Sequence, residues 1–363
     1  MTRSRELAEL ASAYDSGSSL GFRNRIINGD MRVNQRGFSS SSGIANGTYT
    51  VDRWQYRGTG FMVSLSTNTD APNGFRTSIN MVPFEPGTPG ASEYYSLVQR
   101  IEGFNIADLG LGTANAVPIT VSFWVKSNLT GTFGGSLEFD MGTYVFGYTI
   151  TAANTWEQKF VTFTGLSSAL CVPASVTNGT GLVLNLTAGA GSSRVGAVGL
   201  SSSYFYSVTG ATNFLSSGSN YIRFSGVQLE AGTVATPFER RDYGRELAMC
   251  QRYYWRAVSG ASYTSWGTVN IYNGTLAQAY RQFPVTMRAI PSTFEFSSAG
   301  SYKIDVGASA YTLTAIGNNG NYISPNAMVV DMTAGGGGMT AGQAGQLANL
   351  NNTTNYIGVG AEL

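Results

Sequence analysis

Pairs of carboxylates are the residues whose spacing comes closest to a catalytic arrangement. Glu138 and Asp140 lie two residues apart, and Asp30 and Asp52 form a second pair. Hydrolysis of a glycosidic bond needs two carboxylates on facing walls of a cleft. Residues two apart on a strand share one face, which is the wrong geometry for flanking a bond. A chain with 21 acidic residues contains such pairs by chance, so we expect no catalytic residues and no enzymatic activity.

Oxygen-bearing side chains near the start of the chain raise the question of a structural calcium ion. Asn28, Asp30 and Asp52 offer ligands of the type that calcium prefers. We favour the alternative, a turn at Asn28 together with a strand carboxylate that is hydrogen-bonded to arginine. The chain has no histidine, which excludes His-based triads and His-containing zinc sites. Its glycine-rich runs lack the lysine and the following helix of a phosphate loop, so we predict no metal and no cofactor.

The two cysteines, Cys171 and Cys250, are far apart in sequence and in different local settings. A single disulfide would be compatible with this pair. We favour two buried thiols, because cysteine outside disulfides behaves as a small buried hydrophobe.

Aromatic side chains in polar surroundings are better candidates for binding. Trp124 points away from the apolar face of its expected strand, two tyrosines lie in a serine-rich stretch, and three rings follow the expected junction helix. The candidates are Trp124, Tyr204, Tyr206, Trp255, Tyr263 and Trp266. Such rings stack on the faces of sugars while polar neighbours bond the hydroxyls. They can also fill contacts between subunits of an oligomer, and we favour this second interpretation.

The charge content argues against a polyelectrolyte partner. Charged residues make up 12% of the 363 residues and the net charge is +1, whereas phosphate binding needs a concentrated basic footprint. Most of the 22 basic residues are arginines, which we interpret as structural and interfacial clamps. No apolar run reaches membrane-spanning length, and the N-terminus lacks a signal-peptide core. We expect neither nucleic-acid binding nor membrane insertion.

Period-two alternation of apolar residues predicts β-structure over residues 22–241. In the stretch 119–126, ITVSFWVK, every second residue is apolar, as a half-buried antiparallel strand requires. In the stretch 221–229 the apolar phase changes, and a bulge at Ser225 and Gly226 would produce that change. Many short strands and little helix predict a jelly-roll β-sandwich for this region.

A short amphipathic helix is predicted ahead of the sandwich, within residues 1–21. Its apolar side chains follow helical spacing, but a helix this short is marginal alone in water. We therefore weigh a frayed terminus against a docking segment whose apolar face is buried in a partner. The predicted anchoring residues are Arg3, Arg5, Leu7, Leu10 and Tyr14.

A linker helix is predicted over residues 242–257, with Asp242 as its N-cap. Its apolar stripe consists of Tyr243, Leu247, Cys250 and Tyr254. Residues 258–363 are predicted to form a second β-sandwich, including a short helix that begins at a capping box at Thr340. The predicted fold is therefore all-β: two jelly-roll-like sandwiches joined by a short α-helix.

Several of these segments resemble one protein family, both in their residues and in their order along the chain. The stretch NRIINGDMRVNQRG at residues 24–37, followed by YTVDRW at residues 49–54, resembles the opening of sandwich domains in bacteriophage tail-fibre and related virion proteins. The run from QLEAG to QRYY at residues 228–254 resembles their domain junction, and residues 283–288 and 340–363 resemble their C-terminal module. The first module also resembles a carbohydrate-binding jelly roll.

The resemblance implies a non-enzymatic fibre protein at the tail or capsid surface of a virion. It implies a homo-oligomer, expected to be a homotrimer, that is attached to other virion proteins through its N-terminus and carries its C-terminal module at the far end. Host-surface polysaccharide is the expected ligand. A purely structural decoration protein and a polysaccharide depolymerase are the alternatives, and the resemblance assigns no sugar-contacting residue.

Overall fold

The computed structural model describes residues 22–59 and 63–363. Packing divides the chain into two compact units, one running up to Glu246 and including Leu363, the other Leu247–Glu362. We call these the first unit and the second unit. The predicted docking segment, with Arg3, Arg5, Leu7, Leu10 and Tyr14, lies outside the described residues. Within the described part of the chain, no helix has the length and apolar character needed to cross a membrane.

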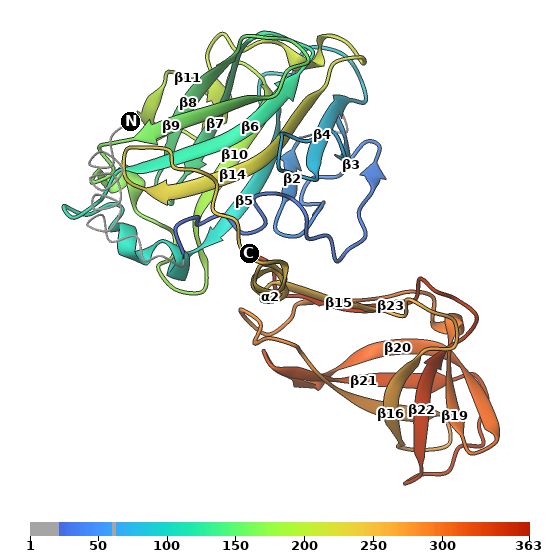
Figure 1. Ribbon diagram of the computed structural model, residues 1–363. Helices are drawn as coiled ribbons and strands as arrows, with labels where there is room; N and C mark the ends of the chain where they lie inside the picture. Colours follow the sequence, from blue (N-terminus) through green and yellow to red (C-terminus); the bar gives the residue numbers. More distant parts are fainter. Residues whose placement is uncertain (1–21, 60–62) are drawn as a thin grey trace, which may run out of the picture. The chain divides into compact units, whose positions relative to one another are not determined.

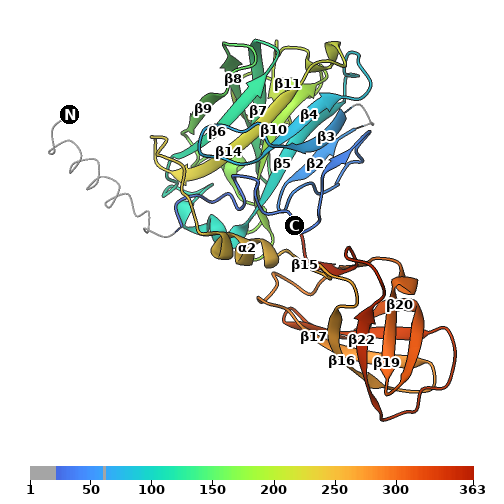
Figure 2. The same cartoon turned by 45° about the vertical axis from the view of Figure 1, so that its right-hand side comes forward.

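The first unit is a β-sandwich of two antiparallel six-stranded sheets (Figures 1 and 2). The first sheet has the order β1 (Ser40–Ser41), β3 (Val63–Asn68), β4 (Ser78–Pro83), β14 (Ile222–Ala231), β6 (Ile119–Ser127), β9 (Glu157–Phe163). The second sheet has the order β12 (Gly199–Ser201), β8 (Thr143–Ile150), β7 (Gly131–Glu138), β10 (Thr180–Ala190), β5 (Tyr94–Glu102), β2 (Gln55–Gly58). The smaller elements are the parallel pair β11 (Val195–Gly196) and β13 (Ser207–Val208) and the 3-10 turns η1 (Gly103–Asn105), η2 (Ala107–Leu109), η3 (Ala169–Cys171) and η4 (Phe214–Ser216).

Strand β6 shows how the sequence produces this sandwich. Val121, Phe123 and Val125 are fully buried in the core between the sheets, whereas Trp124, on the opposite face, is half-buried. The apolar face is therefore as predicted, but Thr120 and Ser122 on the opposite face are also buried, so the strand is more than half-buried. Burial of every second side chain of each strand is the main driving force for closing two sheets on one another.

Strand β14 contains the predicted bulge. Its register against β6 shifts between Ser225 and Gln228. Gly226, inside the shift, has a φ of 59°, a left-handed conformation that glycine adopts without strain. The bulge lets Phe224 and Val227, which lie on opposite sides of it, both point into the core, and the change of apolar phase in the sequence is thereby explained.

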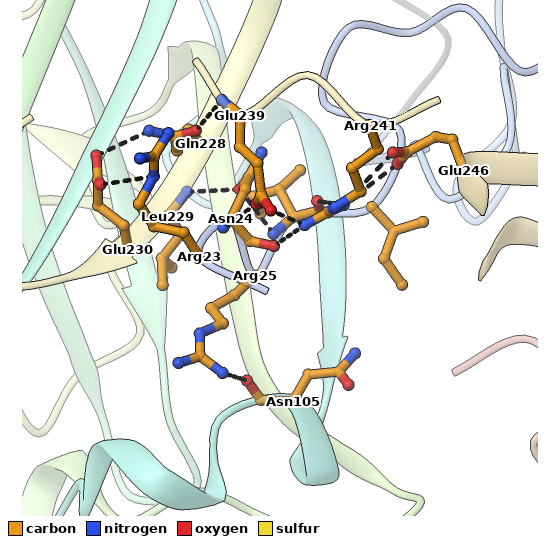
Figure 3. A network of polar contacts seen from close by, with 12 residues as sticks. Arg23, Asn24, Arg25, Asn105, Gln228, Leu229, Glu230, Glu239, Arg241 and Glu246 are labelled. Carbon is orange, nitrogen blue, oxygen red and sulfur yellow. Dashed lines mark hydrogen bonds and ion pairs between the residues drawn. The ribbon is translucent and has the colours of Figure 1, made fainter. Parts of the chain in front are cut away.

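Strand β14 and the segment that follows it are tied to residues 23–30 by a buried polar network (Figure 3). The side-chain oxygen of Asn24 accepts hydrogen bonds from the backbone N–H groups of Ile26 and Leu229, each at 3.0 Å. Its side-chain nitrogen donates to the carbonyl of Val227 at 3.1 Å. One buried side chain therefore satisfies three backbone groups that would otherwise lack partners at the end of the sheet.

Arg241 is the cation of the same network (Figure 3). Its guanidinium donates to the carbonyl of Asn24 and, at 3.1 Å, to that of Ile26. It also pairs with Glu239 at 3.1 Å and with Glu246 at 3.5 Å. Burial raises the pKa of Glu246, and the nearby charge of Arg241 acts in the opposite direction. Arg241 thus offsets part of the free-energy cost of burying the Glu246 carboxylate in a low-dielectric environment.

The second unit contains a closed barrel, which corrects the predicted second sandwich. The barrel order is β16 (Ser265–Ile271), β17 (Leu276–Gln282), β21 (Ala327–Ala334), β20 (Ser309–Ile323), β19 (Tyr302–Val306), β22 (Ala344–Asn349). A separate sheet has the order β15 (Tyr254–Val258), β23 (Tyr356–Gly360), β18 (Thr293–Phe296), and the turn η5 (Ala299–Ser301) precedes β19. Strand β22 pairs with both β16 and β19, which closes the sheet on itself instead of leaving two layers.

Two helix predictions also need correction. The region after Thr340 forms strand β22 instead of a helix, with Leu347 in the barrel core, because cross-strand pairing outweighs the local capping pattern. The linker helix is shorter than predicted: α2 is Tyr243–Gln251, and residues from Tyr254 onward belong to β15. Asp242 does accept from the backbone N–H of Arg245 at 2.9 Å, as an N-cap should, but Tyr243 is exposed rather than part of a buried stripe.

Candidate functional site

The aromatic candidates of the first unit are less accessible than predicted. Trp124 is half-buried, and its ring lies beside Gly226. Tyr204 is partly exposed and donates its hydroxyl hydrogen to the carbonyl of Asp140 at 2.6 Å. Tyr206 is only 4% exposed and stacks on Tyr94 with 4.0 Å between ring centroids. The expectation that Tyr206 is a surface ring is therefore wrong.

The loop that carries Tyr206 covers the outer face of the second sheet. The Thr187 hydroxyl, on β10, donates to the carbonyl of Tyr206 at 2.6 Å and lies 2.8 Å from the hydroxyl of Ser96. Gly134 of β7 allows the close approach, since a Cβ there would stand 2.6 Å from Oγ of Ser207. Ser96 and Thr187 are consequently buried, and this sheet face is closed to a ligand.

Part of the outer face of the first sheet is also covered, by the segment after β14, whereas Phe160 of β9 stays 67% exposed. Gln228 donates to Glu230 at 2.8 Å and accepts from the backbone N–H of Glu239 at 2.8 Å. Glu230 in turn accepts from the backbone N–H of Thr236 at 2.9 Å. Both side chains on the strand are fully buried by these contacts. Residues 228–239 of the junction therefore cover this part of the sheet through polar contacts.

The candidate carboxylates are engaged in internal contacts. Glu138 forms an ion pair with Arg57. Asp52 accepts from Gln35 at 2.6 Å and lies 3.6 Å from Arg36, an arrangement of the kind expected from the carboxylate–arginine interpretation. Among residues 22–59 and 63–363, no group of three or more Cys, Asp or Glu side chains is placed to hold a metal ion.

Both cysteines are buried, and neither belongs to a disulfide. Burial raises the pKa of the Cys171 thiol to about 11. A thiol with a raised pKa is a poor nucleophile at neutral pH. The preference for buried thiols over a disulfide is therefore confirmed.

The second unit brings two of the predicted rings together. Trp255 of β15 and Trp266 of β16 line one hollow of about 390 Å³ together with Tyr280 and Arg281 of β17. We call this the tryptophan hollow. The third predicted ring, Tyr263, is 63% exposed and does not line it.

Each of the two tryptophans packs against a further aromatic ring. The Trp255 ring lies 5.7 Å from that of Phe283, and the Trp266 ring lies 5.8 Å from that of Tyr302, measured between centroids. Rings supported in this way lose little conformational entropy when a ligand binds. The hollow is therefore preformed.

A second hollow lies against the outside of the barrel and was not predicted. Tyr272 and Tyr322, 61% and 64% exposed, line a space of about 390 Å³ with Gln278, Asn319 and Asp331. We call this the tyrosine hollow. Exposed rings beside amide and carboxylate groups are the combination that binds sugars, because the rings cover the apolar sugar face and the polar groups bond its hydroxyls.

The polar groups of the tyrosine hollow are held in place by cross-strand contacts. Gln278 of β17 and Asp331 of β21 are direct partners in the ladder, and the Gln278 amide donates to Asp331 at 2.9 Å. Asn319 of β20 donates to the same carboxylate oxygen at 3.4 Å. One carboxylate oxygen of Asp331 thus orients two amides. These two hydrogen bonds leave its other oxygen as an acceptor.

The tyrosine hollow was not predicted, because its residues come mainly from three strands and the sequence does not show that these strands are neighbours. A signal was nevertheless present in LAQAYRQ, residues 276–282. Its buried positions are Ala277 and Ala279, while Gln278 and Tyr280 face outward. Small residues on one face of a strand face the barrel interior, so Gln278 on the other face is placed on the exterior, where the tyrosine hollow lies.

Comparison with known proteins gives structural similarity over part of the chain. No protein-family model matches, and no curated protein matches in sequence. Similar solved structures include an enzymatically active domain of tailspike protein 4 from bacteriophage CBA120, at 19% identity and a TM-score of 0.28 over 53% of this chain and 21% of that chain. The xylan-binding CBM22-1 domain of Paenibacillus barcinonensis Xyn10C is 14% identical, with a TM-score of 0.25 over 54% of this chain and 94% of that domain.

A third similar structure is TmCBM61 in complex with β-1,4-galactotriose, which is 12% identical with a TM-score of 0.28 over 58% of this chain and 99% of that chain. The chain spans about a fifth of the tailspike domain and about a quarter of the Clostridium thermocellum xylanase modules that it also matches. At these TM-scores, the function of this chain has to be argued from its own residues.

Proposed function

We propose that this chain is a fibre protein of a bacteriophage virion that attaches to host-surface glycan without catalysing a reaction. In this proposal the first unit is a scaffold and the second unit contacts the glycan. Residues 1–21 attach the protein to other virion proteins, and three copies associate. The family resemblance of residues 24–54 and 228–254 supports the virion assignment, and the hollows of the second unit support the glycan assignment.

The tyrosine hollow is the observation that carries the glycan proposal. In the sandwich, the outer face of the second sheet around Thr187 and that of the first sheet around Gln228 are covered by the chain itself. Tyr272 and Tyr322, in contrast, are exposed beside three hydrogen-bonding side chains that are already oriented. Sugar hydroxyls can be bound by rings and amides without a concentrated basic footprint, which agrees with the low charge content of the chain.

Glycan-array binding by the full chain and by two variants tests this proposal. Tyr272→Ala and Tyr322→Ala should each lower binding to host polysaccharide by roughly two- to tenfold, as expected when an aromatic contact worth ~0.5–1.5 kcal/mol is lost. Tyr263→Asn is the matched control, because it removes an equally exposed tyrosine that lines neither hollow. Asparagine also tolerates the left-handed backbone of residue 263.

The glycan proposal fails if a folded oligomer binds no host glycan and does not block infection. It also fails if Tyr263→Asn weakens binding as much as the two hollow variants do. Melting temperatures of all variants should lie close to that of the wild type, because the substituted rings are exposed.

A purely structural decoration protein is the second candidate. This candidate is favoured if the aromatic hollows bind neighbouring subunits instead of sugars. Deletion of residues 1–20 should then abolish incorporation into virions while both units stay folded, and normal incorporation would count against anchoring through this segment. A depolymerase, the third candidate, requires the release of reducing ends from host polysaccharide.

A further inference from the structure

The tryptophan hollow contains a guanidinium that no described residue neutralises. Arg281 follows buried Ala277 and Ala279 in the alternation of β17, so it lies on the face of the strand that points into the barrel. The structure gives it no ion pair and no hydrogen bond within the described residues, and its Nη2 atom is buried. Burial without a counter-charge lowers the pKa of Arg281.

The backbone of β16 makes room for this guanidinium. Gly267 lies at a register shift of β16 against β22 and has a φ of 104°. A Cβ at this position would stand 3.1 Å from Nη1 of Arg281. A glycine with this backbone conformation, placed directly against the cation, keeps the site open where any side chain would crowd it.

A second donor in the same hollow also lacks a partner. Nε1 of Trp266 is buried and makes no hydrogen bond with any described residue. Buried donors are nearly always paired in native proteins, and two unpaired donors lining one hollow point to an acceptor that comes from outside. Arg281 is the one charged residue among those described that line the hollow, so the acceptor should be an anion.

The shape of the donor set selects the kind of anion. A guanidinium has a planar fork that matches the two oxygens of a carboxylate, and the rings of Trp255, Trp266 and Tyr280 offer apolar surfaces on which a sugar ring stacks. The volume of about 390 Å³ lies at the small end of ligand pockets. We propose that the tryptophan hollow binds a carboxylate-bearing sugar residue of a glycan, with Arg281 and Trp266 as the donors to the carboxylate.

This inference rests on the proposed function, because it names the class of glycan that the second unit recognises. The test uses the full chain labelled with ¹⁵N and follows the indole N–H signal of Trp266, assigned by loss of that signal in Trp266→Phe. The probes are galacturonate and N-acetylneuraminate, with galactose as the neutral partner. The Trp266 signal should shift with either acidic sugar and stay in place with galactose.

Substitution of the cation should remove this response. Arg281→Gln is expected to weaken binding of the acidic sugars by about tenfold or more, as expected for the loss of charge-assisted hydrogen bonds. Because Arg281 has no internal partner, this variant should keep the melting temperature of the wild type. Arg281→Lys retains the charge but loses the planar fork. Its affinity for the acidic sugars should therefore lie between that of the wild type and that of Arg281→Gln.

Three results would overturn the inference: no shift with either acid, an equal shift with galactose, or an unchanged affinity in Arg281→Gln. A Trp266 signal that follows protein concentration instead of sugar would assign the hollow to a contact between copies. Loss of neutral-glycan binding in Tyr322→Ala, without any response to acidic sugars, would leave the proposed function intact and refute only this inference.

Discussion

Removal of the buried guanidinium of Arg241 tests whether the polar network fixes the end of the first unit. Arg241→Met keeps an apolar stem of similar length. It removes the donors to the carbonyls of Asn24 and Ile26 and the counter-charge of Glu246. Breaking one side of a buried ion pair costs about 3–5 kcal/mol, because the other charge stays buried. We expect the free energy of unfolding of the first unit to fall by about this amount.

The loss should depend on pH through Glu246. Burial raises the pKa of Glu246 above its ordinary value even in the presence of Arg241, and loss of the cation should raise it further. A carboxyl whose pKa is higher in the folded state binds more protons there, so its contribution to stability falls as pH rises through that window. The penalty should therefore be larger near about pH 7.5 than near about pH 4.5, by ~1.4 kcal/mol for each unit that the pKa rises.

Urea unfolding followed by the indole N–H signal of Trp54 in NMR spectra is a suitable assay, because this signal is resolved from those of the other four tryptophans. Trp54 is fully buried and donates to the carbonyl of Asn28 at 2.8 Å, and the backbone N–H of Asn28 donates to Glu246. The double variant Arg241→Met with Glu246→Gln removes both charges and should be more stable than Arg241→Met alone at neutral pH. A loss below about 1 kcal/mol, or a penalty that does not change with pH, would refute this account.

Three further predictions concern the first unit. Gly134→Val forces its Cβ, 2.6 Å from Ser207 Oγ, into the covering loop, so amide exchange over residues 195–208 should accelerate. Gly226→Ala places a Cβ 2.7 Å from an aromatic ring at a φ of 59°, and denaturant unfolding should show a loss of ~1–3 kcal/mol. The hydrogen bond from Lys126 lowers the pKa of Asp70, so the contribution of Asp70 is present at neutral pH and disappears as pH falls through that pKa. Asp70→Asn should cost roughly 0–1 kcal/mol at neutral pH, given the partial exposure, and nothing in strong acid.

The sequence was sufficient for the sandwich because its strands carry a simple pattern. In residues 119–126 each apolar side chain is separated by one polar side chain or tryptophan, and the structure buries the apolar set. The bulge at Gly226 was also visible, since a change of phase within one strand has few other causes. These features are local, so they need no knowledge of which strands become neighbours.

The barrel and its hollows could not be predicted in the same way. Strand β20 is 15 residues long and has register shifts against β21, and its Gly-rich and Asn-rich sequence shows little alternation. Closure depends on β22 pairing with two distant strands, which is a property of the whole sheet. The tyrosine hollow depends on the same long-range pairing, because Gln278 and Asp331 meet only across β17 and β21.

Burial of Tyr206 was missed for a related reason. Serine-rich stretches are typical of exposed loops, and residues 201–207 fit that description. The loop is nevertheless held on the second sheet by the Thr187 hydroxyl and by the glycine at residue 134. A polar residue on the outer face of a strand can bind solvent or another part of the chain, and composition does not distinguish the two.

The strand edges of both units limit how copies of this chain can meet. In the second unit the closed barrel has no edge, and the edges that remain are those of β15 and β18 in the separate sheet, which have five and four residues. In the sandwich the edge strands β1, β12 and β2 have two, three and four residues. The longer edge strand β9 carries Glu157 and Lys159, joined at 2.5 Å. Short and charged edges disfavour strand addition, so many copies crowded at one surface can touch through side chains without merging their sheets.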